Sequence, residues 1–82
     1  MKRRLKLSSK RKELNLTQRD VVTMLEEKYS ISITESYYGM IEQGVRTPTL
    51  KIALSIASLF DSSPDDIFFN QEPNEKLGKH TA

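Results

Sequence analysis

The chain has 82 residues and a formal net charge of +2, which allows one small domain with a single core. It contains no cysteine, and its single histidine, His80, lies in a polar tail. Disulfides and thiolate metal sites are therefore excluded, and a histidine-based catalytic or metal site is disfavoured. The most apolar run, residues 52–60, is far shorter than the ~20 residues that a membrane-spanning helix needs, and no apolar signal-peptide core follows the basic start. We expect a cytoplasmic protein with no metal, no cofactor, no membrane partner and no evident small-molecule ligand.

Positive charge is concentrated at the N-terminus. Residues 1–12 hold seven Lys/Arg and no acid, residues 13–60 hold four basic and six acidic residues, and residues 61–82 hold two basic and five acidic residues. Such asymmetry is expected of a protein that offers one face to a polyanion. On charge alone, a solubilising or locally disordered leader is an equally good interpretation.

Five segments have helical spacing, and none has the pattern of a strand. The first covers residues 5–14. The second begins after Thr17, which can cap the helix with Asp20 as its box partner, and continues to about Lys28. The inward-facing apolar residues expected from these two patterns are Leu7, Leu14, Val21, Val22, Leu25 and Tyr29.

The third segment, "TESYYGMIEQG" at 34–44, has a strong signal at each end. Thr34 can accept from backbone N–H groups of the first turn, and Gly44 supplies a left-handed cap. Tyr38 and Ile41 point inward together. The outward face then carries small or polar side chains with Tyr37 at its edge: Glu35, Ser36, Gly39 and Met40.

The fourth helix begins at Thr49 and the fifth has Ser63 as its cap and Pro64 at its first position. Together the five segments predict a compact all-α bundle. We expect a basic N-terminal arm at residues 1–4, one domain at 5–69 and a polar flexible tail at 70–82. The fourth helix is expected to bury Leu50, Ala53, Leu54, Ile56, Ala57 and Phe60.

The outward face of the third helix suits the DNA major groove, which is about 12 Å wide and admits a helix by its N-terminal residues. Ser36 can donate to or accept from base edges, and Met40 can pack on a thymine methyl. Glu35 is unfavourable near phosphates unless it accepts from cytosine N4 or is neutralised by a neighbour. A surface helix without a partner is the alternative.

From residue 7 to residue 68 the chain resembles the phage-repressor and Cro type of helix-turn-helix domain, the Xre-like family. The matching segments are "KRKELNLTQRDV" at 10–21, "TESYYGMIEQG" at 34–44 and "RTPTLKIALSIASLFDSSPDDIF" at 46–68. The combination is specific, although each segment alone is weak. It implies a lambda-repressor-like fold and binding to double-stranded DNA.

The resemblance also implies roles for individual residues. Arg11 and Glu42 match a pair that forms an ion pair between the first and third helices in several members. Capping alone is the alternative for Gln18 and Thr49, and a solvated loop charge is the alternative for Arg46. The base-contacting positions are Thr34, Glu35, Ser36, Gly39 and Met40, and the phosphate-contacting positions are Gln18, Arg19, Tyr37, Arg46, Thr47, Thr49 and Lys51.

One departure from the family pattern lies between the second and third helices. Seven residues, 26–32, separate Leu25 from Ile33, where typical members have about one. We expect the second helix to extend by about a turn and the connection to lengthen. Alternatively, Ile31 and Ile33 mark a partner-binding segment.

The ends of the domain give two further expectations. The basic leader, with Lys2, Arg3, Arg4 and Lys6, can contact phosphates, which we favour, or reach the minor groove as an arm. One recognition helix reads few base pairs, so a homodimer is expected, with Phe69 as the symmetric contact unless the tail folds over it.

These features favour a sequence-specific transcriptional regulator that acts as a repressor by occupying an operator. One alternative is the DNA-binding antitoxin of a toxin–antitoxin pair, with the acidic tail as the toxin-binding segment. Another is a protein-interaction module that uses the fold without DNA, which the net charge of −5 over residues 13–82 and the exposed Glu35 would suit. An enzyme is disfavoured because no nucleophile, base and orienting residue come together at a suitable spacing.

Overall fold

Four α-helices and a short π-helix make up residues 3–69, the part of the chain that the computed structural model describes; of Phe69 only the backbone is included. No strand occurs in this part of the chain, so the all-α prediction is confirmed. The predicted tail at 70–82 and Lys2 of the predicted arm lie outside the described residues. In chain order the elements are α1 (Leu5–Glu13), α2 (Gln18–Tyr29), α3 (Glu35–Gln43), α4 (Leu50–Leu59) and η1 (Asp65–Phe69).

Threonine side chains begin three of the helices. Thr17 accepts from the Asp20 N–H at 3.0 Å, and the Asp20 carboxylate accepts from the Thr17 N–H at 2.9 Å, which completes a capping box. Thr34 caps α3 and Thr49 caps α4 in the same way, through N–H groups three residues on. Each such cap contributes about 1 kcal/mol to stability. Gly44, with φ of 82°, ends α3 in the left-handed conformation that its sequence position predicts.

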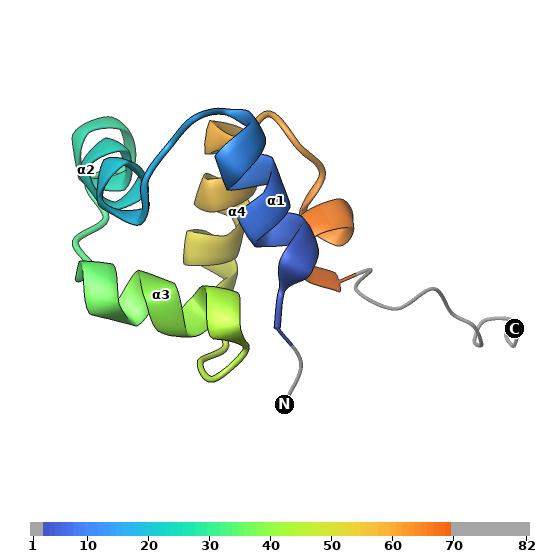
Figure 1. Cartoon of the computed structure of the whole chain (residues 1–82). Helices are drawn as coiled ribbons and strands as arrows, with labels where there is room; N and C mark the ends of the chain where they lie inside the picture. The colour runs from blue at the N-terminus through green and yellow to red at the C-terminus, as the bar shows by residue number, and fades with distance from the viewer. Residues whose placement is uncertain (1–2, 70–82) are drawn as a thin grey trace, which may run out of the picture.

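The helices enclose one core. In Figure 1, α3 runs across one end of the molecule, with α2 beside its N-terminal half and the start of the chain beside its C-terminal end. The contacts agree: α2 packs on α3 and α4, and α1 packs on α3 and η1. The buried apolar side chains are Leu7, Val21, Leu25, Ile31, Tyr38, Ile41, Ala53, Ile56, Ala57, Phe60, Ile67 and Phe68.

The lengthened connection between α2 and α3 is accommodated without loss of packing. Helix α2 continues to Tyr29 and ends at Ser30, whose φ of 57° turns the chain away from the helix axis. Ile31 then enters the core, and Ile33 packs partly against it. Ile31 is therefore a core residue, and the interpretation of this segment as an exposed partner-binding site does not hold for its side chain.

Three leucines expected to be buried are exposed, so that expectation is wrong for Leu14, Leu50 and Leu54. Leu14 follows the last residue of α1, so the helical spacing that predicted an inward side chain does not extend to it. Leu50 is the first residue of α4 and extends past the end of the core, with 66% of its surface exposed. Leu54 lies to the side of the inward stripe, which consists of Ala53, Ile56, Ala57 and Phe60.

Within residues 3–69, every helix is too short or too polar to cross a lipid bilayer.

Candidate nucleic-acid interface

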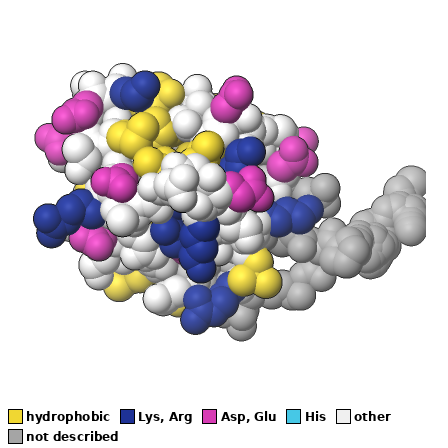
Figure 2. Space-filling view, turned by 45° about the horizontal axis from the view of Figure 1, so that its top comes forward, with side chains coloured by type: hydrophobic (Ala, Val, Ile, Leu, Met, Phe, Trp, Pro, Cys, Tyr) yellow, Lys and Arg dark blue, Asp and Glu magenta, His cyan; other side chains and the backbone are white. Residues whose placement is uncertain are grey.

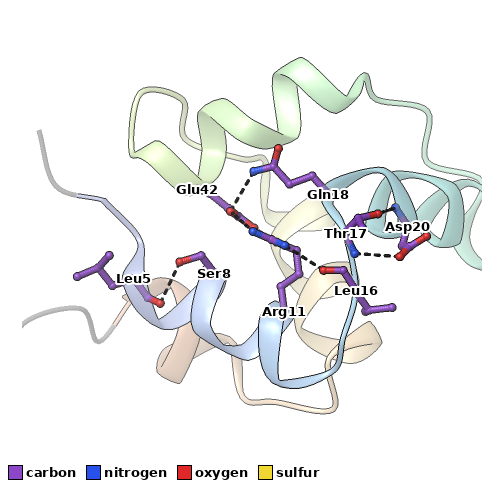
Figure 3. A network of polar contacts seen from close by, with 8 residues as sticks. All are labelled: Leu5, Ser8, Arg11, Leu16, Thr17, Gln18, Asp20 and Glu42. Atoms are coloured by element: carbon purple, nitrogen blue, oxygen red, sulfur yellow. Dashed lines mark hydrogen bonds and ion pairs between the residues drawn. The ribbon is translucent and has the colours of Figure 1, made fainter.

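An ion pair between half-buried Arg11 and buried Glu42 fixes α3 against the start of the domain. The structure brings Arg11 and Glu42 together: Arg11 Nε lies 2.6 Å from Glu42 Oε2, and Nη2 lies 3.1 Å from Oε1. The remaining terminal nitrogen, Nη1, donates to the Leu16 carbonyl at 2.9 Å. Gln18 Nε2 donates to Glu42 Oε1 at 3.1 Å, so one carboxylate receives side chains from α1 and α2 (Figure 3). The network links three helices and sets the position of α3.

The charges in this network stabilise each other. Burial alone would raise the pKa of the Glu42 carboxyl, but the hydrogen bonds from Arg11 and Gln18 outweigh burial and hold that pKa below its ordinary value. The hydrogen bond to Glu42 in turn raises the pKa of Arg11. Both groups are therefore charged at neutral pH.

Gly39 is covered by the Gln18 side chain and is not exposed to solvent. It is buried, and a Cβ built at Gly39 would lie 3.4 Å from Gln18 Oε1. Gly39 was expected to be open on the outward face of α3; it does lie on that face, but the Gln18 side chain covers it. The absence of a side chain lets the Gln18 amide cross α3 and reach Glu42.

The exposed face of α3 forms a shallow hollow. The side chains of Thr34, Glu35 and Ser36 are exposed and Met40 is half-buried. Gln43, exposed and one turn after Met40, also belongs to this face and was missed in the sequence analysis, although its spacing of seven from Ser36 places it there. The hollow is lined by Gln18, Glu35, Ser36, Gly39, Met40 and Gln43.

Arg19 and Glu35 form an ion pair at the rim of the hollow. Arg19 Nε lies 3.6 Å from Glu35 Oε1, and the two side chains are 82% and 51% exposed. The pair joins the first turn of α2 to the first turn of α3. It supplies the neighbouring positive charge that Glu35 needs beside phosphates.

The other residues expected at phosphates lie where solvent can reach them. Arg46, Thr47 and Lys51 are exposed, while Tyr37 is half-buried against the core. Thr49 is exposed, and its hydroxyl accepts from the Ile52 N–H at 3.2 Å, so it caps α4. The first residues of α4 are exposed, and the N–H groups that the cap leaves at this helix N-terminus are of the kind that bind phosphate.

Arg4 was expected to contact phosphates, but in the structure it donates hydrogen bonds to backbone carbonyls within the fold. Its N–H donates to the Glu42 carbonyl at 2.8 Å, and its Nη1 donates to the carbonyls of Ile41 at 2.6 Å and Arg46 at 3.0 Å. The guanidinium carbon also lies 6.0 Å from the centre of the Phe68 ring. Desolvation by burial lowers the pKa of Arg4. Arg4 is therefore a cap for the C-terminal end of α3, which local sequence signals could not predict.

Charges of both signs lie on the face of the molecule seen in Figure 2. On the face seen in Figure 2, Lys and Arg side chains are interspersed with Asp and Glu, and no continuous basic surface forms among the described residues there. Clusters of three or more His, Cys, Asp or Glu side chains able to hold a metal ion are not found in residues 3–69.

Two capped helices held together, with the polar face of the second exposed, define a class of small helical domains that bind double-stranded DNA. A family model described as helix-turn-helix, of the Cro/C1 (Xre-like) type, matches residues 7–67. The chain belongs to this family, as its sequence resemblance indicated, and is a DNA-binding helix-turn-helix regulator. The family is a regulatory one whose members are generally not enzymes. Comparison with curated proteins and with solved structures gives no match.

Proposed function

We propose that the protein is a sequence-specific transcriptional repressor that occupies an operator with α3 in the major groove. The exposed face of α3 is the observation that carries this proposal. This face is mostly polar and forms a shallow hollow, and the helix itself is capped at both ends. A helix that approaches base edges must be held rigidly, and the Arg11–Glu42 pair with Gln18 holds α3 from its inner side. Repression, rather than activation, requires only that the domain cover a promoter. A cytoplasmic location is part of the same proposal.

The proposed contacts divide into two groups by chemistry. Ser36 and Thr34 have hydroxyls for base edges, and Met40 has a thioether for a thymine methyl. Gly39 lines the hollow under Gln18, and its lack of a side chain keeps the hollow open to a base. Around them, cations and N–H donors fix the register on the backbone. The proposed phosphate contacts are Gln18, Arg19, Tyr37, Arg46, Thr47, Thr49 and Lys51.

We further propose that the protein binds DNA as a homodimer. One α3 covers only a few base pairs, and two copies placed on half-sites about one helical turn apart would read twice as many. Leu50 and Leu54 are exposed on α4, and Leu50 lines a mostly apolar groove together with Pro48, Ala53 and Phe68. This surface supports a symmetric contact through α4. The expected contribution of Phe69 stays a prediction, because its side chain lies outside the described residues.

Gel-shift binding to the DNA upstream of the protein's own gene tests the proposal. Wild-type protein should give a shift that resists nonspecific competitor and weakens by roughly 10³-fold or more between about 50 and 200 mM salt. Ser36→Arg should abolish the specific shift because the bulky side chain fills the hollow. Ser9→Arg, which adds the same charge at an exposed position on α1, away from both α3 and the proposed dimer contact on α4, is the matched control and should keep it.

A shift that neither variant alters would place DNA on another surface and contradict the assignment of α3. No shift on upstream DNA or on a random-sequence pool would contradict the repressor proposal and favour a protein-interaction module. The antitoxin alternative depends on the tail at 70–82, and nothing in residues 3–69 favours it.

A further inference from the structure

Glu35 is the one acidic side chain among those that line the hollow on α3. Its position is not explained by capping. Thr34 caps the helix through the N–H of Tyr37, and Tyr37 occupies the position where a capping-box carboxylate would stand. By contrast, Asp20 closes a complete box in α2. A carboxylate in the first turn also suits the positive end of the helix dipole, but that interaction does not require the carboxylate to line the hollow, where Glu35 lies.

The ion pair with Arg19 makes a role for Glu35 in DNA contact feasible. A lone carboxylate would be repelled by the phosphates that flank the groove, and Arg19, 3.6 Å away, compensates that charge. Both side chains remain largely exposed, so they can keep this contact while Arg19 also meets a phosphate and Glu35 meets a base. Glu35 is also the first residue of α3, and the first turn of a recognition helix is the part that reaches base edges.

The chemistry of a carboxylate limits which base it can read. An ionised glutamate only accepts hydrogen bonds. In the major groove guanine presents two acceptors, thymine presents an acceptor and a methyl group, and adenine presents a donor beside the N7 acceptor. Only cytosine offers its N4 amino group without an adjacent acceptor.

We propose that Glu35 is a specificity-determining residue that accepts a hydrogen bond from cytosine N4 in each half-site, with Arg19 as its positioning residue. This inference rests on the proposed function, because it requires α3 to lie in the major groove. A wrong base at this position should weaken binding roughly 10- to 100-fold.

Selection from a random duplex pool with wild type and Glu35→Gln tests the inference. Wild type should enrich a site with one invariant cytosine per half-site. Glu35→Gln should select adenine there, because an amide can bond adenine N6 and N7 together. Glu13→Gln is the matched control: Glu13 also pairs with a basic side chain, Lys10 at 3.8 Å, but lies on α1, and its variant should select the wild-type site.

Modified DNA gives a test on the unchanged protein. N4-methylcytosine at the selected position still pairs with guanine but loses the groove-facing donor, and should weaken wild-type binding roughly 10-fold or more while Glu35→Gln loses no further affinity. If wild type selects a specific site that Glu35→Gln leaves unchanged, or if N4-methylation has no effect, the inference is wrong although the proposed function stands. If wild type enriches no site at all, the proposed function fails and the inference falls with it.

Discussion

Among the described residues, Glu42 is the one charged side chain that is buried, with 6% of its surface exposed. It is held by Arg11 and Gln18, whose hydrogen bonds replace the water that a carboxylate loses on burial. Removing the partner is therefore more damaging than removing the pair, because an uncompensated charge would remain in the core. The contribution of the Arg11–Glu42–Gln18 network is that it fixes the position of α3.

Replacing Arg11 by Met should lower the free energy of unfolding by about 3 kcal/mol at neutral pH, because Glu42 is left buried and unpaired. Urea denaturation measures this loss. In the double variant Arg11→Met, Glu42→Met, which has no buried charge, a large part of the stability should return. A double variant as unstable as the single one would show that packing of the Arg11 stem, rather than charge, dominates.

The lowered pKa of Glu42 predicts how stability depends on pH. A carboxyl with a lower pKa in the folded state stabilises the fold at pH values above its unfolded-state pKa, near 4.5, and that contribution is lost as the pH falls through the folded-state pKa. Urea denaturation between about pH 7 and pH 3 should show this loss in wild type and a smaller one in Glu42→Gln. Equal pH dependence of the two proteins would contradict the prediction.

At Gly39, stability and binding should change in opposite directions. Alanine favours a helix over glycine by about 1 kcal/mol, and the added Cβ meets Gln18 Oε1 at 3.4 Å, an ordinary contact distance. Gly39→Ala should therefore raise the melting temperature by a few degrees. The same methyl group narrows the hollow, so specific DNA affinity should fall. Reduced stability together with unchanged affinity would show that Gly39 serves the packing of Gln18 alone.

At the scale of the elements, the sequence predicted what depends on near neighbours. The threonine caps and the Gly44 stop were predicted correctly because each depends on residues within one helical turn. The exposure of Leu50 and the internal role of Arg4 could not be predicted, because both depend on where a distant element lies. Arg4 meets Ile41 and Arg46, some 40 positions along the chain. The burial of Gly39 was missed for the same reason, because a side chain from α2 covers it.

The C-terminal end of α3 should depend on Arg4. Arg4→Met keeps the apolar stem but removes two donors to the carbonyls of Ile41 and Arg46, and should cost about 2 kcal/mol of unfolding free energy. Amide hydrogen exchange should also become faster at the end of α3. Arg3→Met, at the exposed neighbouring position, should change neither quantity. Equal effects of the two variants would indicate a general role of N-terminal charge.

At the scale of the whole molecule, the basic N-terminus is less available to DNA than its charge suggests. Arg4 and Arg11 have partners within the fold, and Lys10 lies 3.8 Å from Glu13. The face of the molecule seen in Figure 2 mixes both signs. Within residues 3–69, part of the positive charge of a single domain is thus already engaged inside the fold, and doubling the phosphate contacts through a dimer would compensate for this.

Dimerisation through α4 should be abolished by charge at its exposed leucines. Leu54 is 46% exposed, so Leu54→Glu should fold normally, while a carboxylate in a desolvated symmetric contact meets its own copy across the two-fold axis. Sedimentation at concentrations where wild type is dimeric should show a monomer, and operator affinity should fall because one α3 alone holds few base pairs. Val45→Glu, equally exposed but in the loop after α3, is the control and should stay dimeric. If Leu54→Glu is dimeric as well, the symmetric contact lies elsewhere, and the apolar groove beside α4 is not the dimer interface.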